Sequence, residues 1–333
     1  MGFFDTLSRG WTLSKLSFSV VKADPELLLY TFLSAMMVFI TIIAAAYPGY
    51  EAEQSDESHW AMTDQVIDPE TDEPKMVMNE ETGKLEPVGR EPTGEYMAWI
   101  FLTYMIGSII VVFRNSAIIV SAHERLTGGD PTIMTGIKAA FSRIHIIILW
   151  GIIAGTVGLL LRIARDAISN KKAPAALKIL AGIMLWMVEI AWWMYTFFII
   201  PMIVLEKKGI REGLRDSRSL FGKTWGENVT SGLGIGLITL FGIIVSLLIS
   251  YLVFMISPIA GIVIGAALIG ILILWTNTAE VVVVAALYEY AKTGKMPDLN
   301  GNGSQFEEAL PWESKSGWAN ESAETKAWRE GTG

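Results

Sequence analysis

Six long apolar runs limit the folds that this chain can adopt. They cover residues 29–47, 97–121, 146–161, 179–205, 232–256 and 259–287. Each run is long enough, or nearly so, to cross the roughly 30 Å hydrocarbon core of a bilayer. Because water is absent at that depth, each run must satisfy its own backbone hydrogen bonds, as a helix does. The sequence therefore predicts an all-α, polytopic transmembrane helical bundle with six spans.

The composition agrees with this prediction. Hydrophobic residues make up 52% of the chain and charged residues 18%, against about 25% charged residues in soluble domains. The net charge of −8 is concentrated, since thirteen carboxylates lie between Glu51 and Glu91. This uneven charge argues against nucleic-acid binding. The absence of cysteine excludes disulfides, thiolate metal sites and cysteine nucleophiles.

The chain divides into a membrane domain and a polar tail. Residues 1–297 form the six-span domain, with an acidic external loop over residues 49–94 inserted between the first two spans. Within this loop, Lys75–Met78 and Lys84–Glu86 are expected to pair as a β-hairpin. Residues 298–333 are predicted to be an acidic, disordered cytoplasmic tail.

Three amphipathic segments each precede a pair of spans, and they cover residues 1–24, 131–145 and 210–226. In the first segment, Trp11 and Phe18 lie on an apolar face and Lys15 and Lys22 on the opposite face. Such helices lie in the membrane interface. The sequence therefore predicts three repeats of an interfacial amphipathic helix plus two transmembrane helices. The alternative is that six spans fall into three pairs without a true repeat.

The Lys and Arg residues near the span ends predict the orientation. With the N-terminus inside, fourteen of them are cytoplasmic and eight are external, so both termini are expected in the cytoplasm. Basic side chains of the amphipathic segments are then expected to contact lipid headgroups. These candidates are Arg9, Lys15, Lys22, Lys138, Arg143, Arg211, Arg215, Arg218 and Lys223. The external cations between spans three and four, from Arg162 to Lys178, depart from the rule.

Five polar residues at membrane depth form a candidate network, namely Arg114, Asn115, Glu189, Asn277 and Glu280. Ionisable groups at this depth usually face the bundle interior and have a partner. Either this network is a polar pathway, or it is a salt bridge that sets helix packing. We expect Arg114 to pair with Glu280. Small-residue pairs, Gly232 with Gly236 and Gly261 with Gly265, predict close helix packing.

No motif predicts catalysis, a metal or a cofactor. His123-Glu124 resembles the start of a zinc-protease helix, but Thr127 stands where the second histidine is required. Gly222-Lys223-Thr224 resembles the end of a phosphate loop, but Ser217 replaces the required glycine. The sequence therefore predicts no enzyme activity.

Several segments resemble a family of prokaryotic six-span membrane proteins of unknown function. They cover residues 8–11, 113–117, 128–140, 150–161, 196–229 and 286–294. The resemblance implies the fold and the membrane compartment, and no substrate, cofactor or catalytic residue. Members of that family usually carry an apolar residue where Arg114 stands, so the resemblance implies no role for this charge.

Two functions remain open at this point. The first is a non-enzymatic protein of the cell membrane that organises the membrane by binding anionic lipids or a protein partner, which includes a second copy of itself. The alternative is a small permease or channel that uses the intramembrane charges. A polar cavity that reaches these charges would favour transport, and a closed bundle would favour the first function.

Overall fold

The computed structural model describes residues 3–54, 60–62, 76–78, 85–87, 92–170, 174–295, 297 and 299. Six helices are long and apolar enough to cross a membrane. The protein is therefore an all-α, multi-pass membrane protein, as predicted. The predicted three-fold repeat stays a prediction. Most of the acidic loop and almost all of the tail lie outside the described residues.

The secondary-structure elements of the described residues follow in chain order. They are α1 (Phe3–Ala23), α2 (Glu26–Gln54), β1 (Met76–Met78), β2 (Leu85–Pro87), α3 (Gly94–Leu126), α4 (Ile133–Ser142), α5 (Ile144–Asn170), α6 (Ala175–Thr196), α7 (Ile199–Val204), α8 (Ile210–Phe254) and α9 (Pro258–Thr293). The predicted β-hairpin is present, since β1 and β2 pair in antiparallel fashion with Val77 opposite Glu86.

Local sequence signals set the helix ends. Asp24-Pro25 separates α1 from α2, because proline lacks the N–H group that would continue the first helix. The Thr93 hydroxyl accepts a hydrogen bond from the Tyr96 N–H and caps α3. Ser257 caps the start of α9, and Gly294 caps its end. The φ of +72° at Gly294 favours glycine.

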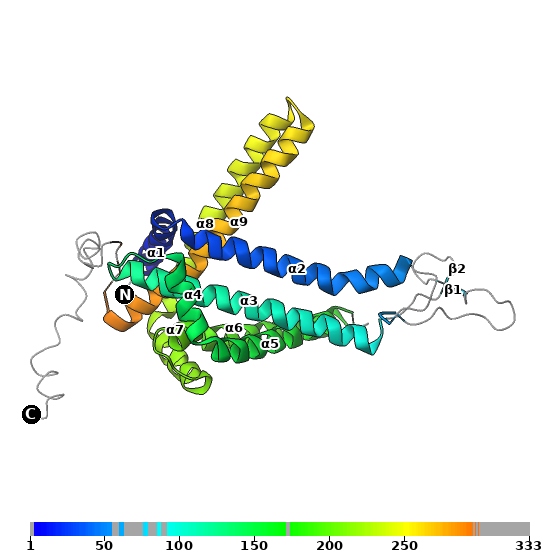
Figure 1. The fold of residues 1–333 in the computed structure, drawn as a ribbon, viewed down its shortest axis with the longest axis horizontal. Helices are drawn as coiled ribbons and strands as arrows, with labels where there is room; N and C mark the ends of the chain where they lie inside the picture. The colour runs from blue at the N-terminus through cyan, green and yellow to red at the C-terminus, as the bar shows by residue number, and fades with distance from the viewer. Residues whose placement is uncertain are drawn as a thin grey trace, which may run out of the picture.

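The spans form three antiparallel hairpins, α2 with α3, α5 with α6, and α8 with α9 (Figure 1). Helices α1, α4, α7 and residues 279–293 of α9 gather at one end of the molecule, which we call the core end. The β1–β2 hairpin lies at the opposite end (Figure 1). The α8–α9 hairpin projects away from the other two hairpins, so its outer half packs only on itself.

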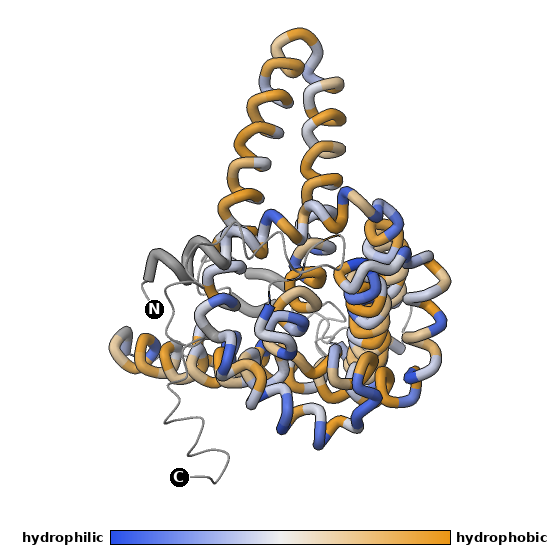
Figure 2. Tube along the Cα trace, turned by 90° about the vertical axis from the view of Figure 1, so that its left-hand side faces the viewer, coloured by the Kyte–Doolittle hydropathy of each residue, from blue (hydrophilic) through white to orange (hydrophobic). Residues whose placement is uncertain are grey.

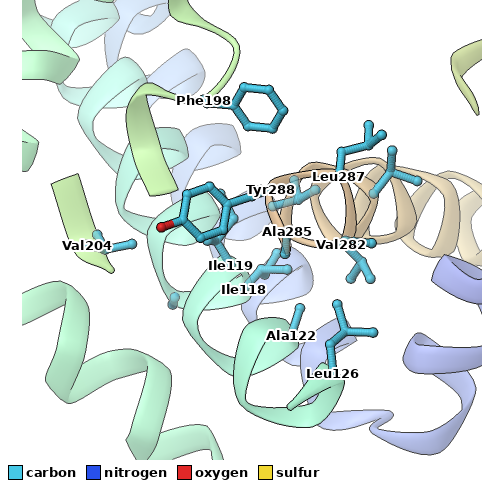
Figure 3. Packing of buried hydrophobic residues seen from close by; sticks show 14 of the residues in the cluster. Ile118, Ile119, Ala122, Leu126, Phe198, Val204, Val282, Ala285, Leu287 and Tyr288 are labelled. Carbon is cyan, nitrogen blue, oxygen red and sulfur yellow. The ribbon is translucent and has the colours of Figure 1, made fainter. Parts of the chain in front are cut away.

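The largest hydrophobic core lies at the core end. There α3 and α9 pack together through side chains such as Ile118, Ala122, Val282 and Ala285, with Phe198 beside them (Figure 3). Alanines at the contact allow the two backbones to approach closely. The Thr31 and Thr278 hydroxyls share a hydrogen bond of 2.7 Å and join α2 to α9 inside this region. The core end therefore fixes the three hairpins relative to one another.

Away from the core end, the spans expose apolar side chains. Phe241, Leu252 and Ile262 of the α8–α9 hairpin are all more than half exposed, and hydrophobic residues dominate this hairpin (Figure 2). Such a surface is unfavourable in water and suits hydrocarbon. The exposed apolar surface is therefore the lipid-facing part of the protein.

The side of α1 that packs against protein consists of small and aliphatic residues. Trp11 is exposed, whereas Leu13, Ser14, Ser17 and Val20 are buried against α8 and α9. The Ser14 hydroxyl donates to the carbonyl of Ser231 at 2.9 Å. Packing therefore uses the small residues of α1, since these bring its backbone close to α8, and Trp11 of the predicted apolar face stays exposed.

One of the two predicted glycine pairs packs helices together. A Cβ atom at Gly261 would lie 2.6 Å from the Phe254 backbone, and one at Gly265 would overlap Ser250. Both glycines therefore bring α9 against α8. Gly232 and Gly236 instead face open space. Between them in sequence, Gly234 makes the close contact, since a Cβ atom there would overlap Ser14.

Helix α8 contains the predicted amphipathic segment and the predicted span in one helix of 45 residues. Thr224 has a non-helical backbone, with φ of −126° and ψ of 16°. The local kink lies between the charged first part of α8 and its apolar second part, Val229–Phe254, which is long and apolar enough to span a membrane.

Candidate functional site

A polar cavity of about 440 Å³ lies between α3, α6, α7, α8 and α9. Its polar lining includes Arg114 and Asn115 from α3, Asn277 and Glu280 from α9, and Ser231 from α8. Apolar side chains complete the wall. The volume falls within the range of small-ligand sites. The structure therefore brings four of the five predicted intramembrane residues into one cavity.

Arg114 uses only part of its hydrogen-bonding capacity within the protein. Its Nε and Nη2 atoms donate to Asn115 Oδ1 at 3.0 and 2.7 Å. A guanidinium has five N–H groups in a planar fork. Within the described residues, Arg114 makes no further hydrogen bond, so the remaining N–H groups are available to a ligand in the cavity.

Glu280 faces the same cavity without a direct partner among the described residues. No ion pair within 4.0 Å joins it to Arg114, although the two charges interact across the space between them. Asn277, one turn earlier, donates from Nδ2 to the Ile273 carbonyl at 2.8 Å. A cation and an anion therefore line one cavity at membrane depth and remain apart.

Apolar side chains border this cavity on the membrane side. Trp193 lines it and is 41% exposed, and Leu233, next to the lining residue Gly232, is 58% exposed. Glu280 is itself exposed. Trp193 and Glu280 therefore line the cavity and are also exposed at the surface of the spans.

Glu189 lies elsewhere. Its carboxylate pairs with Arg165 of α5, and the two residues line a separate small pocket of about 180 Å³. Arg165 therefore neutralises Glu189 locally. The predicted five-residue network differs from the structure in this one member, because α6 directs Glu189 toward α5 and away from α3 and α9.

Comparison with protein families gives a match over most of the chain. The model described as "Family of unknown function (DUF6159)" matches residues 94–297, which is more than half of the sequence. The chain belongs to this family. The predicted membership of an uncharacterised family is thereby confirmed. A comparison with curated protein sequences gave no match.

The DUF6159 region contains the whole polar cavity. It begins with α3 and reaches the end of α9, so every lining residue of the cavity falls inside it. Helices α1 and α2 precede the region. The DUF6159 family description assigns no activity, so the chemistry of the site must be inferred from the side chains.

Most of the predicted headgroup-binding cations are exposed. They are Lys15, Lys22, Lys138, Arg211, Arg215, Arg218 and Lys223. Some also contact neighbours within the protein, since the Arg218 guanidinium lies over the Tyr195 ring at 5.4 Å. The side chain of Arg9 lies outside the described part of the chain.

Arg143 departs from the prediction because it binds protein. Its Nη2 atom donates to the carbonyls of Lys207 and Lys208 at 2.7 and 2.9 Å. Arg143 therefore holds the connection between α7 and α8, and these bonds reduce its capacity for lipid headgroups. The signal that could have revealed this role is its place in the one-residue break between α4 and α5.

Sequence reasoning missed a carboxylate–lysine cluster at the core end. Glu206 contacts the ammonium groups of Lys208 and Lys292 at 2.5 Å each and accepts a hydrogen bond from the Tyr288 hydroxyl at 2.7 Å. Lys208 also contacts Asp216 at 2.7 Å. The cluster joins the α7–α8 connection, α8 and the end of α9.

The cluster shifts the pKa values of its members. Burial alone would raise the pKa of Glu206, but hydrogen bonds from Lys208, Lys292 and Tyr288 outweigh it and lower this pKa to about 2. The hydrogen bonds that Lys208 donates to Asp216 and Glu206 raise the pKa of Lys208. Glu206 and Lys208 are therefore charged at neutral pH and bind each other, which makes the cluster a structural element.

A second clamp connects α1 and α2 to α3. Arg125, at the end of α3, makes a two-pronged contact with the buried Asp24 carboxylate and also contacts Asp130 at 2.6 Å. Such forked pairs are among the stronger polar contacts in proteins.

Within the described residues, no group of three or more His, Asp or Glu side chains is placed to hold a metal ion.

Proposed function

We propose that this protein is a non-enzymatic, membrane-organising protein that binds a zwitterionic phospholipid in its polar cavity. The observation that carries the proposal is the separated pair of charges, Arg114 and Glu280, in a cavity bordered by lipid-facing side chains. An isolated charge at membrane depth is costly. A ligand that carries both charges lowers this cost for both residues at once.

The chemistry of the two residues specifies the headgroup. A guanidinium binds phosphate oxygens through parallel N–H bonds, so Arg114 suits the phosphate. The Glu280 carboxylate accepts hydrogen bonds, so it suits a primary ammonium group. A phosphoethanolamine headgroup carries both. A phosphocholine headgroup lacks the N–H donors that Glu280 requires.

The exposed basic side chains support an orientation for this protein. We place the protein in the cell membrane with both termini in the cytoplasm. The segments that then lie in the cytoplasm carry more Lys and Arg than the external segments, as is usual for membrane proteins. The first half of α8, with Arg211, Arg215 and Arg218, then lies against the cytoplasmic leaflet. Anionic lipids there attract these charges.

Lipid retention measured by native mass spectrometry tests the proposal. The purified protein is offered phosphatidylethanolamine and phosphatidylcholine with identical acyl chains. We expect a preference for phosphatidylethanolamine of at least about tenfold, since a hydrogen bond to a charged group contributes about 1.5–3 kcal/mol. Glu280→Gln should reduce this preference, and Arg114→Gln should reduce retention of both lipids.

Glu189→Gln is the matched control, because it removes an intramembrane carboxylate that does not line the polar cavity. This variant should keep the wild-type lipid preference. Equal retention of the two lipids by the wild-type protein would overturn the headgroup assignment.

A small permease or channel is the second candidate, and the cavity that reaches the intramembrane charges favours it. Flux of small ions and zwitterions in proteoliposomes separates the two functions. Flux that Arg114→Gln or Glu280→Gln abolishes, with unchanged lipid retention, would favour transport. Lipid preference without flux would favour the proposed lipid-binding function.

A further inference from the structure

A second, larger cavity lies between α2, α3 and α5. Its volume is about 770 Å³ and most of its lining is apolar, and we call it the apolar groove. Small residues create the space, namely Ala45, Ala46, Gly107, Ala154 and Gly155. This groove shares no lining residue with the polar cavity.

The threonine and serine hydroxyls of the groove are already bonded within the protein. The Thr41 hydroxyl donates to the Val38 carbonyl at 2.7 Å. The Ser108 hydroxyl donates to the Gly151 carbonyl at 2.8 Å, and the Thr103 hydroxyl bonds within its own helix. Because these donors are occupied, the groove offers little to water or to a polar solute. Its surface suits a hydrocarbon chain.

The dimensions of the groove match such a chain. Along α3 the lining extends from Tyr96 to Val112, which is about 24 Å at 1.5 Å per residue. The hydrocarbon core of a bilayer is about 30 Å thick. The groove therefore follows most of one side of a span.

One charged residue, Arg162 of α5, lines the groove among the residues described. It lies one helical turn beyond Gly158, whose Cβ position is 3.2 Å from the Tyr104 hydroxyl near the start of α3. Arg162 is therefore near the end of the groove that is opposite to the core end. Within the described part of the chain, its guanidinium makes no hydrogen bond or ion pair.

The neighbouring cations are occupied. Arg165 pairs with Glu189, and Lys178 donates to the Ser169 carbonyl at 3.1 Å. Of these three cations, Arg162 is the one that makes no hydrogen bond or ion pair with the described residues. A basic residue here departs from the charge distribution expected for an external loop, and an anionic partner would account for it.

We propose that the apolar groove binds an acyl chain of an anionic phospholipid, whose phosphate contacts Arg162. The charge of Arg162, the hydrocarbon surface and the length of the groove all match this ligand. The site lies in the leaflet opposite to the core end. It is thus distinct from the polar cavity in position, in lining and in headgroup charge.

Native mass spectrometry with phosphatidylglycerol and phosphatidylcholine of identical chains tests this site. The wild-type protein should prefer phosphatidylglycerol by about fivefold, as expected for one basic residue near a membrane surface. Arg162→Gln should reduce this preference, and Arg162→Lys should keep it. An unchanged preference in Arg162→Gln would overturn the headgroup contact.

A second variant tests the chain site. The nearest atom to a Cβ at Gly107 is Thr41 Oγ1 at 3.6 Å, so Gly107→Phe places its ring in the groove. This variant should retain one lipid fewer than the wild type. Gly182→Phe on α6, where nothing lies within 4 Å, is the control and should retain the wild-type number. If Gly107→Phe also retains that number, the groove holds no lipid chain.

The two proposals fail separately. The phosphatidylethanolamine preference depends on Glu280, and lipid retention in the polar cavity depends on Arg114. The phosphatidylglycerol preference of the apolar groove depends on Arg162. A wild-type result in one set of variants therefore leaves the other proposal intact.

Discussion

Individual charged residues hold parts of this protein together that backbone hydrogen bonds do not connect. Glu206 lies in the short connection after α7, yet its carboxylate contacts Lys292 and Tyr288 at the end of α9. Arg125 similarly joins the end of α3 to Asp24 between α1 and α2. These contacts are specific because each carboxylate binds two or more donors at once.

The lowered pKa of Glu206 predicts a loss of stability in acid. The folded protein holds this pKa at about 2, below the ordinary value of 4.5, so folding favours the ionised carboxylate. The stabilisation is present above about pH 4.5 and is lost as the pH falls toward 2. Glu206→Gln should cost about 2 kcal/mol at pH 7, and a smaller difference between the two proteins should remain at pH 3.

Thermal unfolding in detergent between pH 7 and pH 3 measures this effect. Glu212→Gln, on the exposed start of α8, is the control and should follow the wild-type pH dependence. An equal difference between wild type and Glu206→Gln at both pH values would show that the ionised carboxylate contributes nothing.

The depth of the intramembrane residues could be predicted from the sequence, and some of their partners could not. Depth follows from the number of residues between a charge and the end of its span, at a fixed rise per residue. This count predicts a similar depth for Arg114 and Glu280, and the two residues line the same cavity. The partner of Glu189 depends on the rotation of α6 about its axis, which only the packing of the whole bundle determines.

At the scale of the elements, close contact between α1 and α8 depends on single glycines. A Cβ atom at Gly10 would overlap both the side chain and the backbone of Thr230. Gly236, further along α8, has nothing within 4 Å of its Cβ position. Gly10 therefore lies in a tight contact between two helices, whereas Gly236 lies on an open helix surface.

This contrast predicts opposite effects of one substitution. Gly10→Ala should lower the free energy of unfolding by about 1–3 kcal/mol, because the added methyl group pushes α1 away from α8. Gly236→Ala should be neutral or stabilise by up to about 1 kcal/mol, because alanine has the higher helix propensity. Urea or thermal unfolding in detergent compares the two. Equal effects would show that the α1–α8 contact can relax freely.

Sequence periodicity predicted where the helices lie more reliably than which face each one buries. The β-hairpin, the break at Asp24-Pro25 and all six spans follow from local composition. The buried face of α1 does not, since Trp11 is exposed and Ser14 and Ser17 are buried. In a membrane, apolar side chains lose nothing by facing lipid, so hydrophobicity no longer identifies the inward face.

At the scale of the whole molecule, one end is densely packed and the three hairpins extend from it (Figure 1). The α2–α3 hairpin carries the acidic loop at its far end. The basic segments of α4 and α8 lie toward the core end. The acidic and the basic segments of the sequence therefore belong to opposite ends of the structure.

This arrangement predicts which positions are accessible from each side of the membrane. Glu53→Cys, at the exposed end of α2, should react with an impermeant thiol reagent from outside. Arg215→Cys should react only after the membrane is opened, because the first half of α8 is expected in the cytoplasm. The cysteine-free chain provides the background, and its lack of labelling is the control. The reverse pattern would invert the orientation of the protein.

The α8–α9 hairpin has a consequence for the way the protein enters its membrane during synthesis. No charged residue lies between Glu227 and Glu280, and the turn itself exposes Met255 and Ile256. The tip of this hairpin can therefore cross the bilayer without carrying a charge through hydrocarbon, where each would cost about 2.5–3.5 kcal/mol at the helix centre. In the proposed orientation, the α2–α3 hairpin must instead export a loop with thirteen carboxylates. The first hairpin thus depends on the translocation machinery to pass its loop, whereas the last can partition into the lipid as a preformed pair of helices.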